Sequence, residues 1–410
     1  MGDAFSRLVQ SKNVNIAGET TGRSALKGGN MLAGFLLSGF LLALLGAILP
    51  AWGYHRDPPE FNVVGNYFLS LALGVIAATR VAEALRSLRG VSVLLVTGCV
   101  LSCAALFFLA GVPVPPAGSV WLRAVGLLAL GAGAGLLNVA LFHGITPRYQ
   151  RDPAGTVVIG GAWYGIGCLA ATLLVAGTFY AYTVPSILIL MAVVPGLYAG
   201  VYWRTRIAAA PVAQRSVREV LADFRSPGAI LFALLLFFQF GNEWSIAGWL
   251  PIFLIRRVGL SQSGALLLLA LYWVFLLIGR LVAIAVLPRV RHTRLLLGSV
   301  LAAIFGCLIL FSTNNGFGAA TGVFFVGSGF ASIYPLVTEA IGRRFPYYHP
   351  GFFNGIFTFA QVGGLIAPAT LGYAAGFWGV GVVLGIPLIG TFMVMLLLIS
   401  IWLESKVTGR

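Results

Sequence analysis

Long apolar runs separated by short polar breaks dominate the chain. Twelve runs are long enough to cross a bilayer as helices, since a crossing needs about 20 mostly apolar residues. The breaks between them carry turn-forming residues, as in Asp57-Pro58-Pro59. The pattern predicts an all-α integral membrane protein with twelve transmembrane helices at approximately 30–53, 63–85, 91–112, 119–144, 156–178, 182–204, 228–255, 262–287, 294–312, 318–341, 351–376 and 379–403. The fifth and sixth are separated by little more than Tyr180-Ala181, which makes that pair the weakest of the predicted breaks.

Composition supports lipid as the main solvent. Of the 410 residues, 59% are hydrophobic and 9% are charged, and the mean hydropathy is +0.96. A soluble domain carries about a quarter charged residues, so the 26 basic and 11 acidic residues are too few to cover a water-facing surface. The net charge of +15 does not form one basic patch, because the basic residues are scattered between apolar runs. This excludes a soluble class and a nucleic-acid partner.

The distribution of Lys and Arg predicts the orientation. Twenty of these residues lie in the N-terminal tail, in alternate loops and in the C-terminal tail, whereas the other loops hold Arg56, Arg256 and Arg257. Positively charged loops stay on the cytoplasmic side. The sequence therefore predicts a multi-pass protein of the cell (inner or plasma) membrane, with both termini in the cytoplasm and an even number of spans.

Internal similarity divides the chain into two halves. Arg80 to Arg89 parallels Arg280 to Arg289 at an offset of 200, and Leu49-Pro50 parallels Leu250-Pro251 at an offset of 201. Such matches at nearly one offset indicate duplication of a six-helix unit. The predicted organisation is a disordered cytoplasmic tail at 1–29, an N-terminal six-helix bundle at 30–204, a cytoplasmic linker at 205–227, a C-terminal six-helix bundle at 228–403 and a cytoplasmic tail at 404–410.

Six plus six helices joined by a central cytoplasmic loop resemble the major facilitator superfamily. Within it, the second half is most similar to the fucose-permease-like branch of sugar symporters. The residues that carry this similarity are Gln239-Phe-Gly-Asn242-Glu243, Gly248-Trp249-Leu-Pro251, Gly279-Arg280, Tyr334-Pro335 and Gln361 to Pro368. The resemblance implies two pseudo-symmetric bundles that rock about a site near the midplane, which opens alternately to either side.

The chain departs from that branch in its first half. The fucose symporter of the branch carries acidic residues in its first and fourth helices, and here the fourth span offers Asn138 and His143 instead. The proton-coupling scheme of the branch therefore does not transfer to these helices. His143 is interpreted as structural before it is considered as a proton relay.

Glu243 is the main candidate for the chemistry of transport, because a carboxylate within a membrane helix is costly and is usually retained for function. Gln239 and Asn242 lie mostly on the same helix face and offer hydrogen-bonding groups for a polar solute. Desolvation near mid-bilayer disfavours a charged carboxyl group, so Glu243 is also the predicted proton-coupling residue. The alternative is a hydrogen-bonded cluster that holds helices together.

Further polar and aromatic residues fall near the midplane of helices that line the cavity in the superfamily. Under an offset of 197, Tyr164 corresponds to Gln361, so both are expected to face the cavity from opposite bundles. Aromatic packing is the alternative for each single aromatic residue. The additional substrate-binding candidates are Asn138, Trp163, Tyr164, Tyr272, Tyr334, Asn354 and Gln361.

Charged residues near the cytoplasmic helix ends are candidates for a gate, as the resemblance suggests. They are Arg80, Glu83, Arg280 and Glu339, and Arg280 is expected to pair with Glu339. The alternative for such residues is simple anchoring at the membrane surface. His55, His292 and His349 lie in predicted loops and are interpreted as solvated.

The sequence favours a secondary active transporter of a small polar organic solute, with a sugar favoured and proton coupling expected. Proton-driven efflux of drugs or metabolites is one alternative, and a non-transporting membrane sensor is another. The loops carry no cluster of acids, histidines and a nucleophile, so no enzyme is predicted. The four cysteines lie inside apolar runs and indicate no disulfide, metal or cofactor. The expected partners are the solute, the lipid bilayer and a coupling proton, for a monomeric protein.

Overall fold

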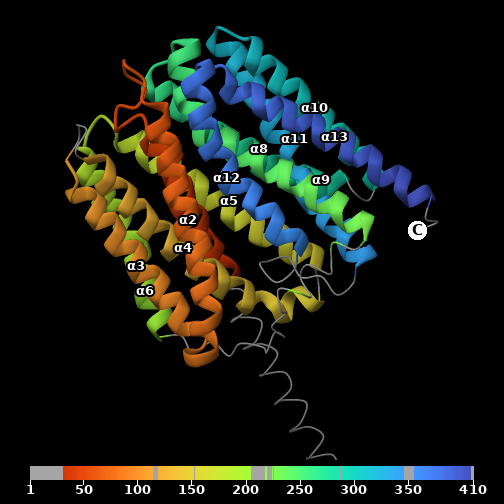
Figure 1. Cartoon of the computed structure of the whole chain (residues 1–410), viewed down its shortest axis with the longest axis horizontal. Coiled ribbons are helices and arrows are strands. Elements are labelled where there is room, and N and C mark those ends of the chain that lie inside the picture. The colour runs from red at the N-terminus through yellow and green to blue at the C-terminus, as the bar shows by residue number, and fades with distance from the viewer. Residues whose placement is uncertain are drawn as a thin grey trace, which may run out of the picture.

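The computed structural model is all-helical over the residues it describes, which are 31–113, 119–151, 153–204, 218, 224, 226–286, 289–345 and 355–407. Twelve helices in this part are long and apolar enough to span a membrane (Figure 1). The first covers Met31–Ile48. The others are α2 (Phe61–Arg89), α3 (Val91–Gly111), α4 (Val120–Arg151), α5 (Pro153–Thr178), α6 (Val184–Arg204), α8 (Pro227–Val258), α9 (Gln262–Val286), α10 (His292–Ser312), α11 (Gly316–Arg344), α12 (Gly355–Trp378) and α13 (Val382–Val407).

The twelve predicted spans are confirmed, including the separate fifth and sixth helices, but two predicted boundaries are wrong. The first helix ends at Ile48 rather than near residue 53. It gives way to consecutive turns in which the Gly53 amide donates to the Pro50 carbonyl at 3.0 Å, and Gly53 has a φ of 84° that favours glycine. The fourth helix continues past residue 144 to Arg151, with Pro147 inside it.

The helices form two bundles, coloured red to yellow-green and green to blue in Figure 1. In the first bundle, α4 packs against α2 and α3, and α3 also packs against α6. In the second, α8 packs against α12 and α13, and α10 against α11. The bundles meet mainly where α2 contacts α12 and where α5 contacts α9. The predicted tail at 1–29 and nearly all of the predicted linker at 205–227 lie outside the described residues.

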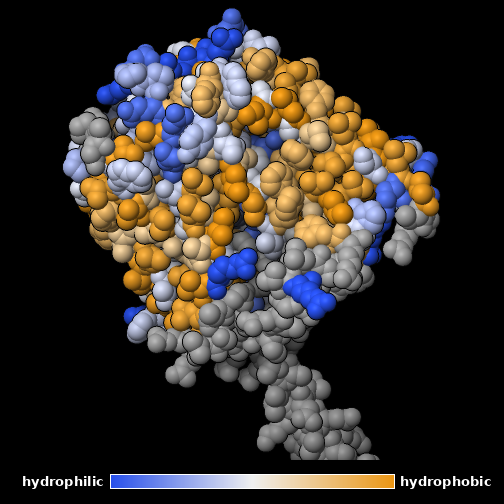
Figure 2. Space-filling model, viewed as in Figure 1, coloured by the Kyte–Doolittle hydropathy of each residue, from blue (hydrophilic) through white to orange (hydrophobic). Residues whose placement is uncertain are grey.

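The outside of the helical assembly is apolar. Leu73, Phe107, Leu197 and Ile389 are all exposed and come from four different helices. Figure 2 shows apolar side chains across the middle of the visible face and hydrophilic ones toward its upper end. A water-facing surface would not carry so many large apolar side chains, so this surface is the one that contacts lipid.

The two bundles are closed against each other at one end of the molecule. We call it the outer end: it carries the turns after the first helix, and the arginine distribution predicts that it faces away from the cytoplasm. Arg256 of the second bundle pairs with Asp57 of the first at 2.7 Å and also donates to the His55 carbonyl at 3.2 Å. The Tyr373 hydroxyl of α12 donates to the Asn66 side chain of α2.

A buried arginine organises the first bundle at this outer end. Arg123 is 3% exposed, and its guanidinium donates to the Tyr54 hydroxyl at 3.0 Å and to the Pro113 carbonyl at 2.7 Å. It also lies 5.3 Å from the centre of the Trp52 ring, within range of a cation–π contact. These contacts hold the turns after the first helix against α4.

Candidate functional site

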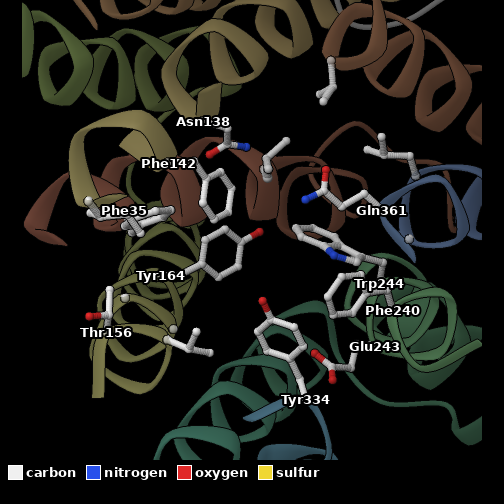
Figure 3. A pocket seen from close by; sticks show the side chains of 18 of the residues that line it. Phe35, Asn138, Phe142, Thr156, Tyr164, Phe240, Glu243, Trp244, Tyr334 and Gln361 are labelled. Carbon is white, nitrogen blue, oxygen red and sulfur yellow. The ribbon is translucent and has the colours of Figure 1, made fainter. Parts of the chain in front are cut away.

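A cavity of about 210 Å³ lies between the two bundles. Its wall is formed by the first helix, α2, α4 and α5 on one side and by α8, α9, α11 and α12 on the other. Most of the lining side chains are apolar, among them Phe35, Phe142, Phe240 and Trp244 (Figure 3). The polar lining residues are Asn138, Thr156, Tyr164, Glu243, Arg280, Tyr334 and Gln361.

The cavity lies toward the inner end of the molecule, by which we mean the end where the first helix and α5 begin. Phe35 is in the second turn of the first helix, and Thr156 is in the first turn of α5. Contacts between the bundles close the outer end, and the cavity lies toward the inner end. We call this arrangement inward-facing, with inner in the sense just defined.

Glu243 lies near the middle of the 32-residue helix α8 and faces the cavity. One carboxylate oxygen accepts a hydrogen bond of 2.7 Å from the Gln239 side chain, one helical turn away. Gln239 itself is fully buried and does not line the cavity. Residues at i and i+4 lie above one another on a helix. Gln239 therefore positions the Glu243 carboxyl group from a buried place outside the cavity lining.

Arg280 comes from α9, near its inner end, and also lines the cavity. Side chains on a helix lean toward its N-terminus, so the long Arg280 side chain extends from this position back toward mid-membrane. Its Nη1 group donates to the backbone carbonyl of Gly161 on α5, which belongs to the other bundle. A Cβ atom at Gly161 would lie 3.0 Å from this nitrogen, so the glycine allows the guanidinium to reach the backbone.

Amide and phenol groups occupy the rest of the polar lining. The Asn138 side chain accepts a hydrogen bond of 2.5 Å from Ser38 of the first helix. Tyr164 and Gln361 reach the cavity from opposite bundles, as their offset predicts (Figure 3). Aromatic contacts fix the tyrosines: the Tyr164 ring centre lies 6.0 Å from that of Trp244, and Tyr334 lies 5.0 Å from Phe240.

Comparison with known proteins identifies the family. Residues 31–368 match the model of the Major Facilitator Superfamily. The chain belongs to this superfamily. It is therefore a multi-pass membrane transporter and not an enzyme, and its fold is the two-bundle fold that the sequence predicted.

Individual relatives are distant. An uncharacterised transporter of the superfamily from Yersinia pestis is 24% identical over 399 residues, which cover 92% of this chain and 94% of the relative. Among solved structures, the chain is similar to the D-xylose-proton symporter, with a TM-score of 0.72 and 16% identity over 91% of this chain and 95% of that one.

Two further structures match with slightly lower scores. The fucose:proton symporter FucP of E. coli has a TM-score of 0.62 and 17% identity over 92% of this chain and 99% of that one. The nucleoside transporter NupG has a TM-score of 0.62 and 14% identity over 91% and 98% of the two chains. At these identities the similarity establishes the superfamily fold and leaves the solute open.

Several predicted site residues do not line the cavity. Asn242 points to α13 and donates to the Thr391 hydroxyl at 3.3 Å, because it lies about 100° around the helix from Glu243. Tyr272 is fully buried with its ring centre 5.1 Å from that of Trp273. Trp163 packs against the hydrophobic core. Asn354 lies outside the described residues.

The predicted pairing of Arg280 with Glu339 is wrong for this conformation. The Glu339 carboxylate bonds instead to His292 at 3.1 Å and to Arg343 at 2.5 Å, both in the second bundle. The sequence analysis interpreted His292 as solvated. In the structure its side chain is half-buried and pairs with Glu339. Sequence placed Arg280 and Glu339 near the same membrane surface but could not show that the Arg280 side chain extends into the cavity.

Among the described residues, the ion pairs near the inner end form within the second bundle. Arg80 is exposed on α2, and the side chain of Glu83 lies outside the described residues. Arg344 forms a bidentate ion pair with Glu404, with N–O distances of 2.6 and 2.5 Å, within the second bundle. A gating role for Arg80 and Glu83 stays a prediction. His143 is 1% exposed and is not among the residues that line the cavity.

Sequence reasoning missed the phenylalanine and tryptophan side chains of the wall. Phe240, Glu243 and Trp244 stand at i, i+3 and i+4, so one face of α8 supplies all three to the cavity. Once Glu243 was placed in the site, this spacing could have identified its two neighbours. In the part of the chain that the structure describes, no group of three or more His, Cys, Asp and Glu side chains could hold a metal ion.

Proposed function

We propose that the protein is a secondary active transporter that carries a small polyhydroxylated solute, with a sugar as the favoured class, and couples its movement to a proton. One observation supports this proposal above all. The carboxyl group of Glu243 lies at the wall of a cavity between the two bundles, and a hydrogen bond from Gln239 holds it there. Amide and phenol groups beside it suit hydroxyl groups, and the aromatic rings suit the apolar C–H faces of a sugar ring. The xylose and fucose symporters, to which the chain is similar in fold, carry solutes of this class.

Alternating access gives the transport cycle. In the inward-facing arrangement the solute exchanges with the predicted cytoplasmic side. For the cavity to open on the other side, α2 must separate from α12 and the Arg256–Asp57 pair must break. This pair is weak, because Asp57 is 82% exposed and exposed ion pairs contribute about 1 kcal/mol or less. The outer end therefore contains a contact that can break easily during each cycle.

Coupling follows from the two protonation states of Glu243. A protonated carboxyl group can donate a hydrogen bond to a solute hydroxyl, whereas a carboxylate can only accept one. Proton binding and solute binding at one cavity are then linked, so that each changes the affinity for the other by the same factor. A proton gradient can drive accumulation through this linkage.

The test is uptake into vesicles that contain the purified protein. Glu243→Gln keeps the size and one hydrogen-bond donor but cannot titrate. We expect this variant to bind and exchange solute across the membrane but not to accumulate it against a gradient when a pH gradient is imposed. Glu60→Gln is the matched control, because Glu60 is exposed at the outer end. Uphill uptake by Glu243→Gln equal to that of the unmodified protein would show that Glu243 is not the coupling residue.

Efflux of an apolar drug or metabolite is the second candidate, and the mostly apolar cavity wall favours it. The same vesicles distinguish the two functions. An apolar dye that moves with the proton gradient and is not competed by sugars would support efflux. Competition by a sugar would support the first proposal.

The orientation and the assembly state are also proposals. We infer that both termini face the cytoplasm, that the bundles correspond to residues 30–204 and 228–403, and that the protein works as a monomer. The arginine distribution supports the orientation, and the central cavity within one chain supports the monomer.

A further inference from the structure

We propose that Arg280 binds a carboxylate of the transported solute, so that the substrate is a sugar acid or a similar hydroxy acid rather than a neutral sugar. This inference rests on the proposed transport function and specifies its solute. The argument starts from the charges in the cavity. Among the described residues that line it, Glu243 and Arg280 are the charged ones.

The Arg280 guanidinium is not satisfied by the protein. Its Nη1 group donates to the Gly161 carbonyl, but its Nε–H is buried and makes no hydrogen bond to any residue that the structure describes. No ion pair joins Arg280 to Glu243 within the described ranges, where Glu243 accepts from Gln239 instead. A cation beside apolar walls is costly unless an anion neutralises it, and the Glu243 carboxyl group, which interacts electrostatically with Arg280, does so only while it is ionised.

A carboxylate is the group that this guanidinium would bind best. The planar fork of an arginine matches the two oxygens of a carboxylate and can form two parallel hydrogen bonds with it. A lysine would offer a point charge without this geometry. With Nη1 directed at the α5 backbone and Nε buried without a partner, the described residues leave the edge formed by Nε and Nη2 without an acceptor.

Other polar groups of the wall suit hydroxyl groups. The Oε1 atom of Gln361 is buried and accepts no hydrogen bond from the part of the chain that the structure describes. An amide oxygen is an acceptor, so its partner must be a donor such as a solute O–H group. The hydroxyls of Tyr164 and Tyr334 point toward the same space (Figure 3). A ligand that carries a carboxylate and several hydroxyls matches this set of lining groups.

The charge balance explains why an acid would enter with a proton. With Glu243 protonated, the two charged lining residues leave one positive charge, which a single carboxylate neutralises. With Glu243 ionised, the same solute would leave the cavity with a net negative charge among apolar walls, which is unfavourable. After the proton leaves, the Glu243 carboxylate also competes with the solute for Arg280. Anion and proton would therefore bind together and leave together.

The inference can be tested on the purified full-length protein with matched pairs of compounds: D-galactose with D-galacturonate, D-glucose with D-glucuronate and D-xylose with D-xylonate. A ligand that binds the folded state raises its melting temperature. We expect the acid of at least one pair to stabilise the protein at a concentration at which its neutral partner does not. Calorimetric titration then gives the affinity for that acid.

Variants assign the effect to Arg280. Loss of a hydrogen bond to a charged group weakens binding about 10- to 100-fold, so Arg280→Gln should reduce the affinity for the acid by this factor. Arg280→Lys keeps the positive charge but cannot form two parallel hydrogen bonds with a carboxylate. It should therefore reduce the affinity for the acid less than Arg280→Gln does. Arg257→Gln removes an exposed arginine outside the cavity and should leave the affinity unchanged.

The inference fails if neutral sugars bind as tightly as their acids, if no acid of the panel stabilises the protein, or if Arg280→Gln leaves the affinity for the acid unchanged. The comparison of acids with neutral sugars needs only the unmodified protein, so poor folding of a variant cannot leave the question undecided. Proton-driven uptake of a neutral sugar alone would overturn this inference but support the proposed function. Binding of an acid without proton-driven uptake would support this inference but contradict the proposed proton-coupled function.

Discussion

The contact between α2 and α12 allows a direct test of alternating access. Gly372 of α12 faces the backbone of α2: a Cβ atom at Gly372 would lie 2.6 Å from the Gly65 nitrogen and 2.7 Å from the Phe61 carbonyl oxygen. Backbone atoms of a packed helix cannot move aside as a flexible side chain can. Gly372→Ala should therefore oppose closure of the outer end.

The expected size of the effect follows from overpacking. An extra methyl group in a tightly packed contact costs about 1–3 kcal/mol. In the superfamily cycle the two helices separate when the outer end opens, so the cost applies mainly to the closed arrangement. A difference of this size shifts an equilibrium between two conformations about 5- to 150-fold toward the state that is open at the outer end.

Distances between spin labels at the outer end measure this shift. Glu60 and Trp378 are exposed and stand next to the start of α2 and at the end of α12. Labels at these positions, in a background without the four native cysteines, should report a longer separation in Gly372→Ala. Gly385→Ala is the matched control, since the added Cβ would meet only Phe311 at an ordinary 3.6 Å.

Two results would refute this reasoning. An unchanged distance distribution in Gly372→Ala would mean that the helices do not separate or that the contact is not tight. An equal shift in Gly385→Ala would mean that a general gain in helix propensity, rather than the local clash, is responsible.

Three further predictions concern stability and topology. Desolvation and the neighbouring Arg56 lower the pKa of His55 below its ordinary value of 6.5. The unfolded chain therefore binds more protons than the folded one, and thermal stability should fall as the pH drops below about 6.5. His55→Gln should flatten this pH dependence of the melting temperature, and an unchanged slope would contradict the prediction. Thr391→Val leaves the buried Asn242 side chain without its Thr391 partner and should destabilise the protein by about 1–3 kcal/mol without changing solute affinity; a change in affinity would place Asn242 in the site. Tags at both chain ends should be accessible only from the cytoplasm, and an external C-terminus would overturn the even number of spans.

The sequence by itself determined the number and position of the spans. Each helix must satisfy its backbone internally and cross an apolar layer of fixed thickness, so length and hydropathy are sufficient signals. The same physics singled out Glu243, because a carboxyl group in a membrane helix is rare. The internal repeat predicted that Tyr164 and Gln361 reach one cavity from opposite bundles, and the structure places them there.

Only the tertiary structure decided which way most polar side chains point. Asn242 and Glu243 are adjacent in sequence, yet one bonds to α13 and the other lines the cavity. Arg280 was expected at a gate with Glu339 and instead lies in the cavity wall. The physical reason is that lipid is as apolar as a packed helix interface, so no contrast between an inner and an outer face marks the rotation of a membrane helix in its sequence. That rotation is set by packing between helices, as where Gly161 of α5 allows the close approach of Arg280.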